Sequence, residues 1–325
     1  MKRLLSVIVV AALGYSGWWV YAAQSLETSV ERWFTEQQQA GWQASYTDIA
    51  VRGFPNRTDL TITNPSLTSP DGRYAWSAPF FQILGLSYKK GHQIVAWPDT
   101  QTLTTPNGDN FISSDGLRAS IVHQESILIR TNIEAATLNV DGPDQAVAFA
   151  GVNAALEKVE PADASYRIAI SVDGIAVSNP RVSGEMAPDA LASLRSDIRL
   201  DLTKPLTLDG PSSDSPQPTY FATSRSAINY GAVTFKVNAD ADIDARGRAS
   251  GEVSLEADNW RDALNAARDS GDLPPALTEA VIELLSMLSG FGGARDALDI
   301  TLGLTDGTVF LGPLPIGELP AIRIP

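Results

Sequence analysis

The N-terminal apolar segment constrains this chain more than any other feature of its sequence. Lys2 and Arg3 precede Leu4–Ala23, LLSVIVVAALGYSGWWVYAA, which carries no charge. At the rise of an α-helix this segment extends roughly 30 Å, the thickness of the hydrocarbon core of a bilayer. Trp and Tyr side chains crowd its C-terminal end, and such side chains favour the headgroup region. The sequence therefore predicts one transmembrane helix, with residues 1–23 forming a short cytoplasmic stub and an anchor.

A cleaved signal peptide is the alternative interpretation of this segment. The apolar run is long for a signal peptide, and cleavage after Ala23 would put bulky Tyr21 where a small residue is preferred. We therefore expect an uncleaved anchor. The basic residues precede the segment and Glu27 and Glu31 follow it, which predicts that the N-terminus stays in the cytoplasm and the rest of the chain is exported.

Composition narrows the range of partners. The formal net charge of −14 argues against nucleic acid, because phosphate binding depends on clustered Lys and Arg. The same charge argues against a domain that lies flat on anionic lipid. The absence of cysteine excludes disulfides, thiolate metal sites and cysteine nucleophiles.

From Trp42 onward the apolar residues alternate with a period of two, as half-buried strands require. Before it, residues 24–41 are predicted to form a juxtamembrane amphipathic helix that ends at Gly41, with its apolar face packed on the domain that follows. Turn dipeptides separate the alternating runs: Asp-Gly at 71, 115, 141, 173, 209 and 306, and Asn-Gly at 107. We expect a mainly β protein: an N-terminal transmembrane helix, then a long curved antiparallel sheet or two β lobes.

A few helices interrupt this pattern. We expect a short helix at 187–195, and two near the C-terminus at 260–268 and 275–288, the latter with a strong apolar stripe. Residues 146–158 fit a strand or a helix, and we favour a strand. The Pro- and Ser-rich segment 210–218 is a possible linker between β lobes at 42–209 and 219–325, and a hairpin within one continuous sheet explains it equally well.

No motif for catalysis, metal or cofactor binding is complete. His92 and His123 are the only histidines, and neither has a second ligand at the spacing of a zinc site. Residues 238–244 begin like a calcium loop but lack its glycine and its final glutamate, so we expect a strand there. Ser87 and Lys90 have the Ser-x-x-Lys spacing without its partner motifs, which indicates an ordinary turn. We expect a protein that is not an enzyme.

Two stretches resemble a family signature, 51–57 (VRGFPNR) and 306–317 (DGTVFLGPLPIG), and the strand at 74–79 (YAWSAP) accompanies them. Together with the anchor, the chain resembles an uncharacterised family of Gram-negative envelope proteins, catalogued as a domain of unknown function, number twenty-one twenty-five. The resemblance covers nearly the whole chain and implies an inner-membrane protein with its body in the periplasm. More loosely, the architecture resembles AsmA-like proteins, which are associated with lipid movement.

Two functions fit these observations. The first is binding of a lipid or another apolar ligand in a groove of the sheet, with Phe54, Trp76, Phe80 and Phe81 as candidate ligand-binding residues. The second is a structural or assembly role in contact with other envelope proteins. The same aromatics can also simply fill a core, because a groove lining and a packed core have the same alternation. The Gly53–Pro55 segment also fits an ordinary turn between strands.

Overall fold

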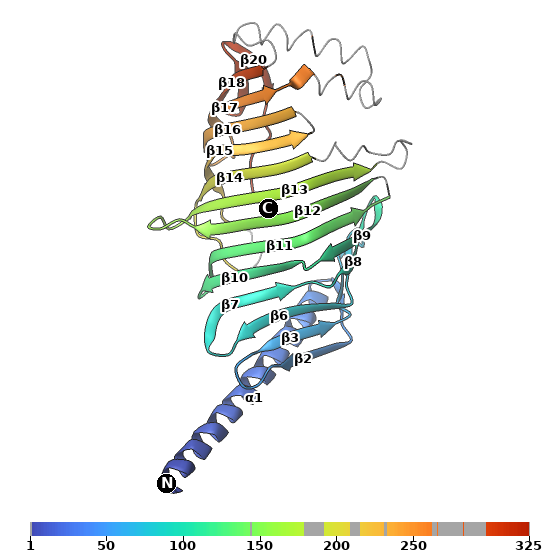
Figure 1. Ribbon diagram of the computed structural model, residues 1–325, viewed down its shortest axis with the longest axis vertical. Helices are drawn as coiled ribbons and strands as arrows, with labels where there is room; N and C mark the ends of the chain where they lie inside the picture. The colour runs from blue at the N-terminus through green and yellow to red at the C-terminus, as the bar shows by residue number, and fades with distance from the viewer. Residues whose placement is uncertain are drawn as a thin grey trace. The chain divides into compact units, whose positions relative to one another are not determined.

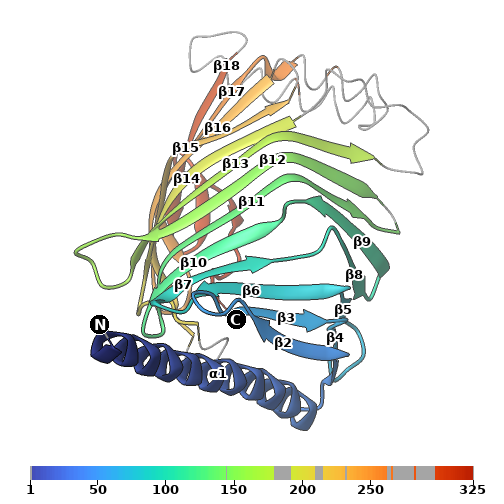
Figure 2. The ribbon, with the colours of Figure 1, turned by 60° about the horizontal axis from the view of Figure 1, so that its bottom comes forward.

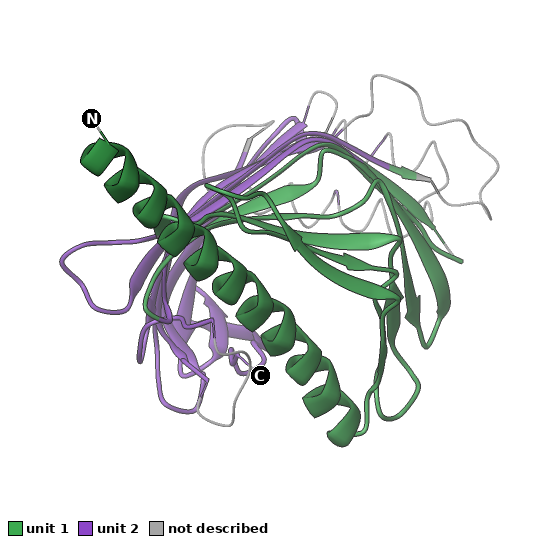
Figure 3. Ribbon diagram, turned by 90° about the horizontal axis from the view of Figure 1, so that it is seen from below, with its two compact units in different colours: residues 1–125, 131–148, 177–183 green, residues 126–130, 149–176, 184–325 purple. Residues whose placement is uncertain are grey.

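The computed structural model describes residues 2–143, 145–178, 192–208, 215–230, 233–261, 265, 282 and 297–324. Within these ranges the chain forms the long helix α1 and twenty strands of a curved, unclosed antiparallel sheet, which confirms the predicted mainly β fold (Figure 1). Two compact units divide the chain (Figure 3). Unit 1 comprises Met1–Glu125, Thr131–Ala148 and Val177–Ser183, and unit 2 comprises Ser126–Arg130, Phe149–Ala176 and Gly184–Pro325.

The apolar segment and the amphipathic helix predicted after it form one continuous helix, α1 (Lys2–Gln39). Its N-terminal part is long and apolar enough to cross a membrane. The helix ends before Gly41, whose φ of +91° lies in the left-handed region that glycine adopts without strain. One helix therefore joins the candidate anchor directly to the folded part of unit 1.

Unit 1 is a meander of sharply bent strands. Two ladders run through it, β2–β3–β6–β7–β10 and β1–β4–β5–β8–β9–β11. The pairs β1/β2, β3/β4, β5/β6, β7/β8 and β9/β10 each run from one ladder into the other, as one strand broken by a bend. The strands are β1 (Gln43–Ser45), β2 (Asp48–Arg52), β3 (Asp59–Thr63), β4 (Ser66–Thr68), β5 (Ala75–Ser77), β6 (Phe80–Leu86), β7 (Lys89–Ala96), β8 (Thr100–Thr105), β9 (Gly108–Asp115) and β10 (Arg118–Gln124). Strands β11 (Ile127–Asp141) and β12 (Ala146–Lys158) contribute residues to each unit.

Proline marks three of these bends, at Pro65, Pro79 and Pro98. Proline cannot donate a ladder hydrogen bond, so it occurs where regular pairing is interrupted. Neighbouring bends still hold together, because the Asn64 N–H donates to the Pro79 carbonyl (2.9 Å) and the Ala78 N–H donates to the Pro65 carbonyl (3.2 Å). The sheet of unit 1 thus curves without losing its continuity.

Helix α1 packs on one face of this curved sheet (Figure 2). Leu60 of β3 pairs with Ile83 of β6, and Ile62 pairs with Phe81, so these four side chains share a face. Phe34 of α1 is only 2% exposed and belongs to the same apolar cluster. This cluster is the core of unit 1.

Unit 2 is a simpler meander, in which each strand from β13 to β20 pairs with the next. Apolar pairs such as Ile168 with Ile198 alternate along it with charged pairs such as Arg167 with Arg199, so the sheet has an apolar and a polar face. The strands are β13 (Ser165–Ser178), β14 (Ala192–Leu202), β15 (Pro218–Tyr230), β16 (Val233–Ile243), β17 (Ala249–Asp258), β18 (Ala297–Thr305), β19 (Thr308–Leu311) and β20 (Leu314–Glu318).

Several local predictions can be compared with this topology. Residues 146–158 form strand β12, as we expected, and the calcium-like run at 238–244 lies mainly in β16. The helix predicted at 187–195 is wrong for residues 192–195, which open β14. Pairing of Leu194 with Ile228 on β15 decides that segment, because tertiary pairing overrides weak helix propensity. Residues 187–191 lie outside the described residues.

A second correction concerns Asp173-Gly174, which the sequence marks as a turn. The dipeptide lies inside β13, where the register with β14 shifts between Val172 and Ile175. A β-bulge therefore uses the glycine here instead of a hairpin.

The C-terminal helices and the linker fall largely on residues that the structure does not describe. Trp260 and Arg261 are helical, but most of 260–268 and 275–288, and residues 209–214 of the linker region, lie outside the described ranges. The division into lobes at 210–218 stays a prediction.

Candidate functional site

An apolar cavity of about 510 Å³ lies within unit 1, between α1 and the curved sheet. Among the described residues of its wall, Ser29 is the one polar residue. The lining residues are Ser29, Val30, Trp33 and Phe34 of α1, together with Leu60, Ile62, Pro65, Leu67, Trp76, Phe81 and Ile83 of the sheet. Ligand pockets in proteins typically measure about 300–1,000 Å³ and are lined mainly by hydrophobic and aromatic side chains.

Two sequence periods meet at this cavity. Val30, Trp33 and Phe34 recur at the i, i+3, i+4 spacing that aligns side chains on one helix face. On the sheet, alternate residues of β3 and β6 point toward that face. The helix and the sheet therefore each supply an apolar surface, and the space that their side chains leave unfilled is the cavity.

The burial of the lining residues indicates where the cavity opens. Leu60 is fully buried and Phe34 nearly so, and these two residues lie in the centre of the apolar cluster. Trp33, by contrast, is 42% exposed although it lines the same space. The mouth of the cavity is therefore beside Trp33 on α1, and its closed end lies against the core.

Aromatic contacts fix the opposite wall. The rings of Trp76 and Phe81 meet edge to face with centroids 6.2 Å apart, and Phe81 contacts Trp97 in the same way at 5.6 Å. The indole Nε1–H of Trp76 donates to Oε1 of buried Gln101 (3.0 Å), which is not a lining residue. Because that donor is satisfied outside the cavity, Trp76 presents only an apolar surface to it.

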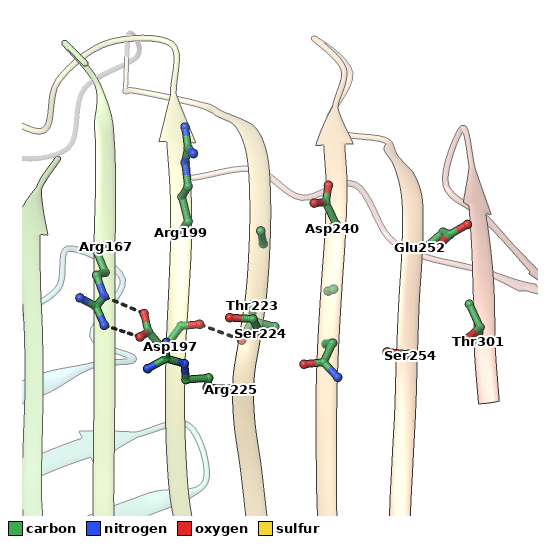
Figure 4. Close-up of a pocket in the computed structure, with 13 residues that line it drawn as sticks. Arg167, Asp197, Arg199, Thr223, Ser224, Arg225, Asp240, Glu252, Ser254 and Thr301 are labelled. Carbon is green, nitrogen blue, oxygen red and sulfur yellow. Dashed lines mark hydrogen bonds and ion pairs between the residues drawn. The ribbon is translucent and has the colours of Figure 1, made fainter. Parts of the chain in front are cut away.

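Unit 2 carries a different kind of depression, about 680 Å³ in volume, on the polar face of its sheet (Figure 4). The Arg167 guanidinium donates to both carboxylate oxygens of Asp197, at 2.8 and 2.5 Å. Thr223 Oγ1 donates to the Asp197 carbonyl (2.8 Å). The Arg167 hydrogen bonds hold the pKa of Asp197 below its usual range, and Asp197 in turn raises the pKa of Arg167.

This pairing limits what Asp197 can do chemically in the polar depression. A carboxylate whose pKa is lowered by a guanidinium stays ionised at neutral pH and does not donate a proton. Among the described residues there is also no group of three or more His, Cys, Asp or Glu side chains placed to hold a metal ion. The depression is an ion-paired polar surface, so the apolar cavity of unit 1 is the stronger candidate site.

The sequence matches a bacterial family described as "Uncharacterized protein conserved in bacteria (DUF2125)" over residues 19–320. The chain belongs to DUF2125. No curated protein and no solved structure matches it. The looser similarity to AsmA-like proteins stays a hypothesis about architecture.

The DUF2125 match includes every residue that lines the cavity, since all of them fall between positions 29 and 83. It begins at Trp19, within α1, so the C-terminal part of the helix belongs to the matched region. In this DUF2125 chain the cavity is therefore built entirely from residues that the family description covers.

The structure brings together two of the four predicted ligand-binding residues. Trp76 and Phe81 both line the cavity. Phe80 pairs with Thr63 and lies on the opposite face of β6 from Phe81. Phe54 lies in the turn after β2, 52% exposed, with its ring edge to face with Trp19 at 5.5 Å. Whether any of the four contacts a ligand stays a prediction.

The sequence analysis missed the contribution of α1 to the cavity. The apolar stripe that contains Val30, Trp33 and Phe34 was visible in the sequence, and we interpreted it as a face that packs on the domain. That interpretation holds for Phe34, which is buried in the core. No sequence signal separates Trp33 from Phe34 on this stripe, because the partial exposure of Trp33 is seen only in the structure.

Proposed function

We propose that this DUF2125 protein binds a lipid acyl chain or a similar apolar ligand in the cavity between α1 and the sheet of unit 1. The observation that carries the proposal is the cavity itself: about 510 Å³, with one polar residue among the described residues of its wall. Burial of an acyl chain is favourable by about 0.8 kcal/mol per methylene, so a half-buried chain would bind measurably. The function is binding, without catalysis.

The proposed source of the ligand is a membrane. The apolar N-terminal part of α1 anchors the protein once in the inner membrane, and the body of the chain lies on the periplasmic side. The same helix carries Val30 and Trp33, which line the cavity, and Trp33 lies at its mouth. A ligand that leaves the bilayer thus reaches the cavity along one continuous element.

Native mass spectrometry of the full-length protein tests the proposal. The full chain is required because α1 supplies one wall, so a fragment that starts at Trp42 would lack it. We expect lipid to remain bound to the wild type after detergent is removed in the gas phase. Organic extraction followed by lipid mass spectrometry identifies its class.

Two neighbouring phenylalanines provide a matched pair of variants. Phe81→Ala changes the cavity wall, whereas Phe80→Ala removes the same ring from the opposite face of the same strand. We expect Phe81→Ala to alter the amount or chain length of the bound lipid, and Phe80→Ala to leave both unchanged. Val30→Trp, which fills the cavity from the helix side, should displace lipid while circular dichroism remains that of a β protein.

The proposal fails if the wild type carries no lipid, or if the Phe80 and Phe81 variants affect lipid equally. In that case the remaining hypothesis is a structural or assembly role in contact with other envelope proteins. Loss of folded structure in both variants would show that both rings are needed for the core. The Val30→Trp variant then tests whether the space beside α1 holds lipid.

A further inference from the structure

Two turns of unit 1 are fastened to the middle of α1. These are the β2–β3 turn, residues 53–58, and the β6–β7 turn, residues 87–88. The Tyr15 hydroxyl donates to the Pro55 carbonyl (2.6 Å) and lies 3.0 Å from Ser87 Oγ. One turn further along α1, the Trp19 indole N–H donates to the Arg57 carbonyl (2.8 Å). The two turns also bond to each other, since the Ser87 N–H donates to the Asn56 carbonyl (3.1 Å).

These contacts limit how deeply α1 can enter a bilayer. The helix is free of the turns only up to Gly14, and Leu4–Gly14 extends roughly 17 Å at the rise of an α-helix. The hydrocarbon core is roughly 30 Å thick, so this segment alone is too short to cross it. In Figure 1 the N-terminal part of α1 projects past strands β2 and β3, with the turns beside its middle. The rest of the span must come from Tyr15–Ala23, so a helix that crosses the membrane takes the two turns, which bond to Tyr15 and Trp19, into the membrane at its boundary.

The side chains on the turns suit that boundary. Phe54 is 52% exposed and Tyr88 is 71% exposed, each at the tip of its turn. Trp18 and Tyr21 are also exposed on α1. Aromatic rings of this kind concentrate at the headgroup level of membranes, where one part of the ring is apolar and another is hydrated.

The charge of the turns also differs from that of the whole chain. The chain has 38 acidic and 24 basic residues. Residues 52–58 and 84–92, which are the two turns with the adjoining ends of their strands, contain Arg52, Arg57, Lys89 and Lys90 and no Asp or Glu. Three carboxylates come from adjoining elements. Glu27 of α1 accepts the Val51 N–H (2.9 Å), next to Arg52. Asp59 pairs with Arg57 at 2.8 Å, and Glu125 lies in the turn after β10, the strand that pairs with β7. A local excess of basic residues next to a membrane-spanning helix favours anionic lipid headgroups.

We propose that the β2–β3 and β6–β7 turns insert into the headgroup layer of an anionic phospholipid bilayer, with Phe54 and Tyr88 at the lipid boundary. Unit 1 is then seated directly on the membrane surface and is not held away from it by a linker. This inference rests on the proposed anchoring by α1, but it does not depend on whether the cavity holds a ligand. It also limits the argument from net charge, which applies to the chain as a whole and not to these turns.

The absence of cysteine makes a direct test possible. Single cysteines are placed at Tyr88, at Phe54, at Tyr74 and at Val10 of the full-length protein, and each is labelled with an environment-sensitive fluorophore. Tyr74 is the matched control, because its exposed fraction of 49% is similar to that of Phe54. It lies in the turn between β4 and β5, at the other end of the bent strands. The proteins are reconstituted in phosphatidylglycerol-containing vesicles with and without spin-labelled lipids, and circular dichroism checks that each labelled variant is folded.

We expect the probes at Tyr88 and Phe54 to show blue-shifted emission and to lose intensity with lipids spin-labelled near the headgroup. The probe at Val10 should respond to lipids labelled deep in the acyl chain, and the probe at Tyr74 should respond to neither. Quenching at Tyr88 and Phe54 no stronger than at Tyr74, with Val10 still quenched, overturns the inference and leaves the anchor intact. If Val10 is not quenched either, both the anchor and the inference fail, while lipid retention by the cavity remains a separate measurement.

Discussion

The two units build similar two-faced antiparallel sheets, but the depression of each unit lies on a different kind of face. In unit 1 the strands bend sharply, and α1 covers the apolar face that Leu60, Ile62, Phe81 and Ile83 form. In unit 2 the meander continues strand by strand, and its polar face carries paired charges such as Arg167 with Asp197. The covered face of unit 1 encloses an apolar cavity, whereas the depression of unit 2 is polar.

This difference shows that alternation alone does not determine what a sheet can bind. A strand with a period of two gives one apolar face wherever it occurs. An apolar cavity arises only where a second element covers that face without filling it, as α1 does in unit 1. On the polar face of unit 2, Arg167 pairs with Asp197 across strands and Arg199 pairs with Asp201 along β14, so the depression there is lined by ion pairs.

The largest expected effect comes from the core of unit 1. Leu60 is fully buried beneath α1, so Leu60→Ala should lower the free energy of unfolding by about 2–5 kcal/mol, through lost burial and the space left behind. Urea denaturation measures the loss. Hydrogen exchange should place it in β3 and β6 and leave β15 and β16 protected. Thr63→Ala on the same strand is the control, and a similar loss in both variants would contradict a helix-covered core.

A smaller effect is expected in unit 2, where a buried aromatic is held by polar contacts. Tyr166 is fully buried, and its hydroxyl accepts the Leu206 N–H (2.9 Å) and donates to the Leu128 carbonyl (3.4 Å). Tyr166→Phe keeps the ring and leaves that N–H without its acceptor, which should cost about 1–3 kcal/mol. The same denaturation experiment measures it. Stability equal to that of the wild type would show that water or another group replaces the hydroxyl.

The smallest effects concern acidic turns, one in each unit. In unit 2, the Arg248 and Arg246 backbone N–H groups donate to Asp244 and lower its pKa from 3.8 to about 2. In unit 1, Asp71 accepts the Ser69 hydroxyl and the Arg73 N–H, and its pKa is also lowered. A lowered folded pKa adds stability that is present above the ordinary pKa and is lost as the pH falls through the folded value.

We therefore expect Asp244→Asn to be less stable than the wild type at neutral pH, and the difference should disappear as the pH falls from about 4 to about 2. Asp71→Asn should behave in the same direction. Thermal unfolding followed across this pH range measures both differences. A stability difference for Asp244→Asn that does not change with pH would show that the carboxylate charge is not what the turn uses.

The sequence determined the local structure of much of this chain. Alternation in runs such as residues 59–63 fixed the faces of the strands, because successive side chains must point to opposite sides. Dipeptides such as Asp306-Gly307, with φ of +51° and +83°, fixed hairpin turns. The twenty uncharged residues before Gln24 predicted a helix that is long and apolar enough to cross a membrane, and α1 has such a segment.

Only the tertiary structure decided which of those faces encloses space. Trp76 and Phe81 line the cavity while Phe80 lies on the other side of the sheet, because pairing between distant strands sets the register, and a shift of one residue would exchange the two faces. The part played by Trp33 depended on how closely α1 approaches the sheet. A packed core and a cavity wall share one pattern of residues, and they differ only in whether atoms from a distant part of the chain fill the space between them.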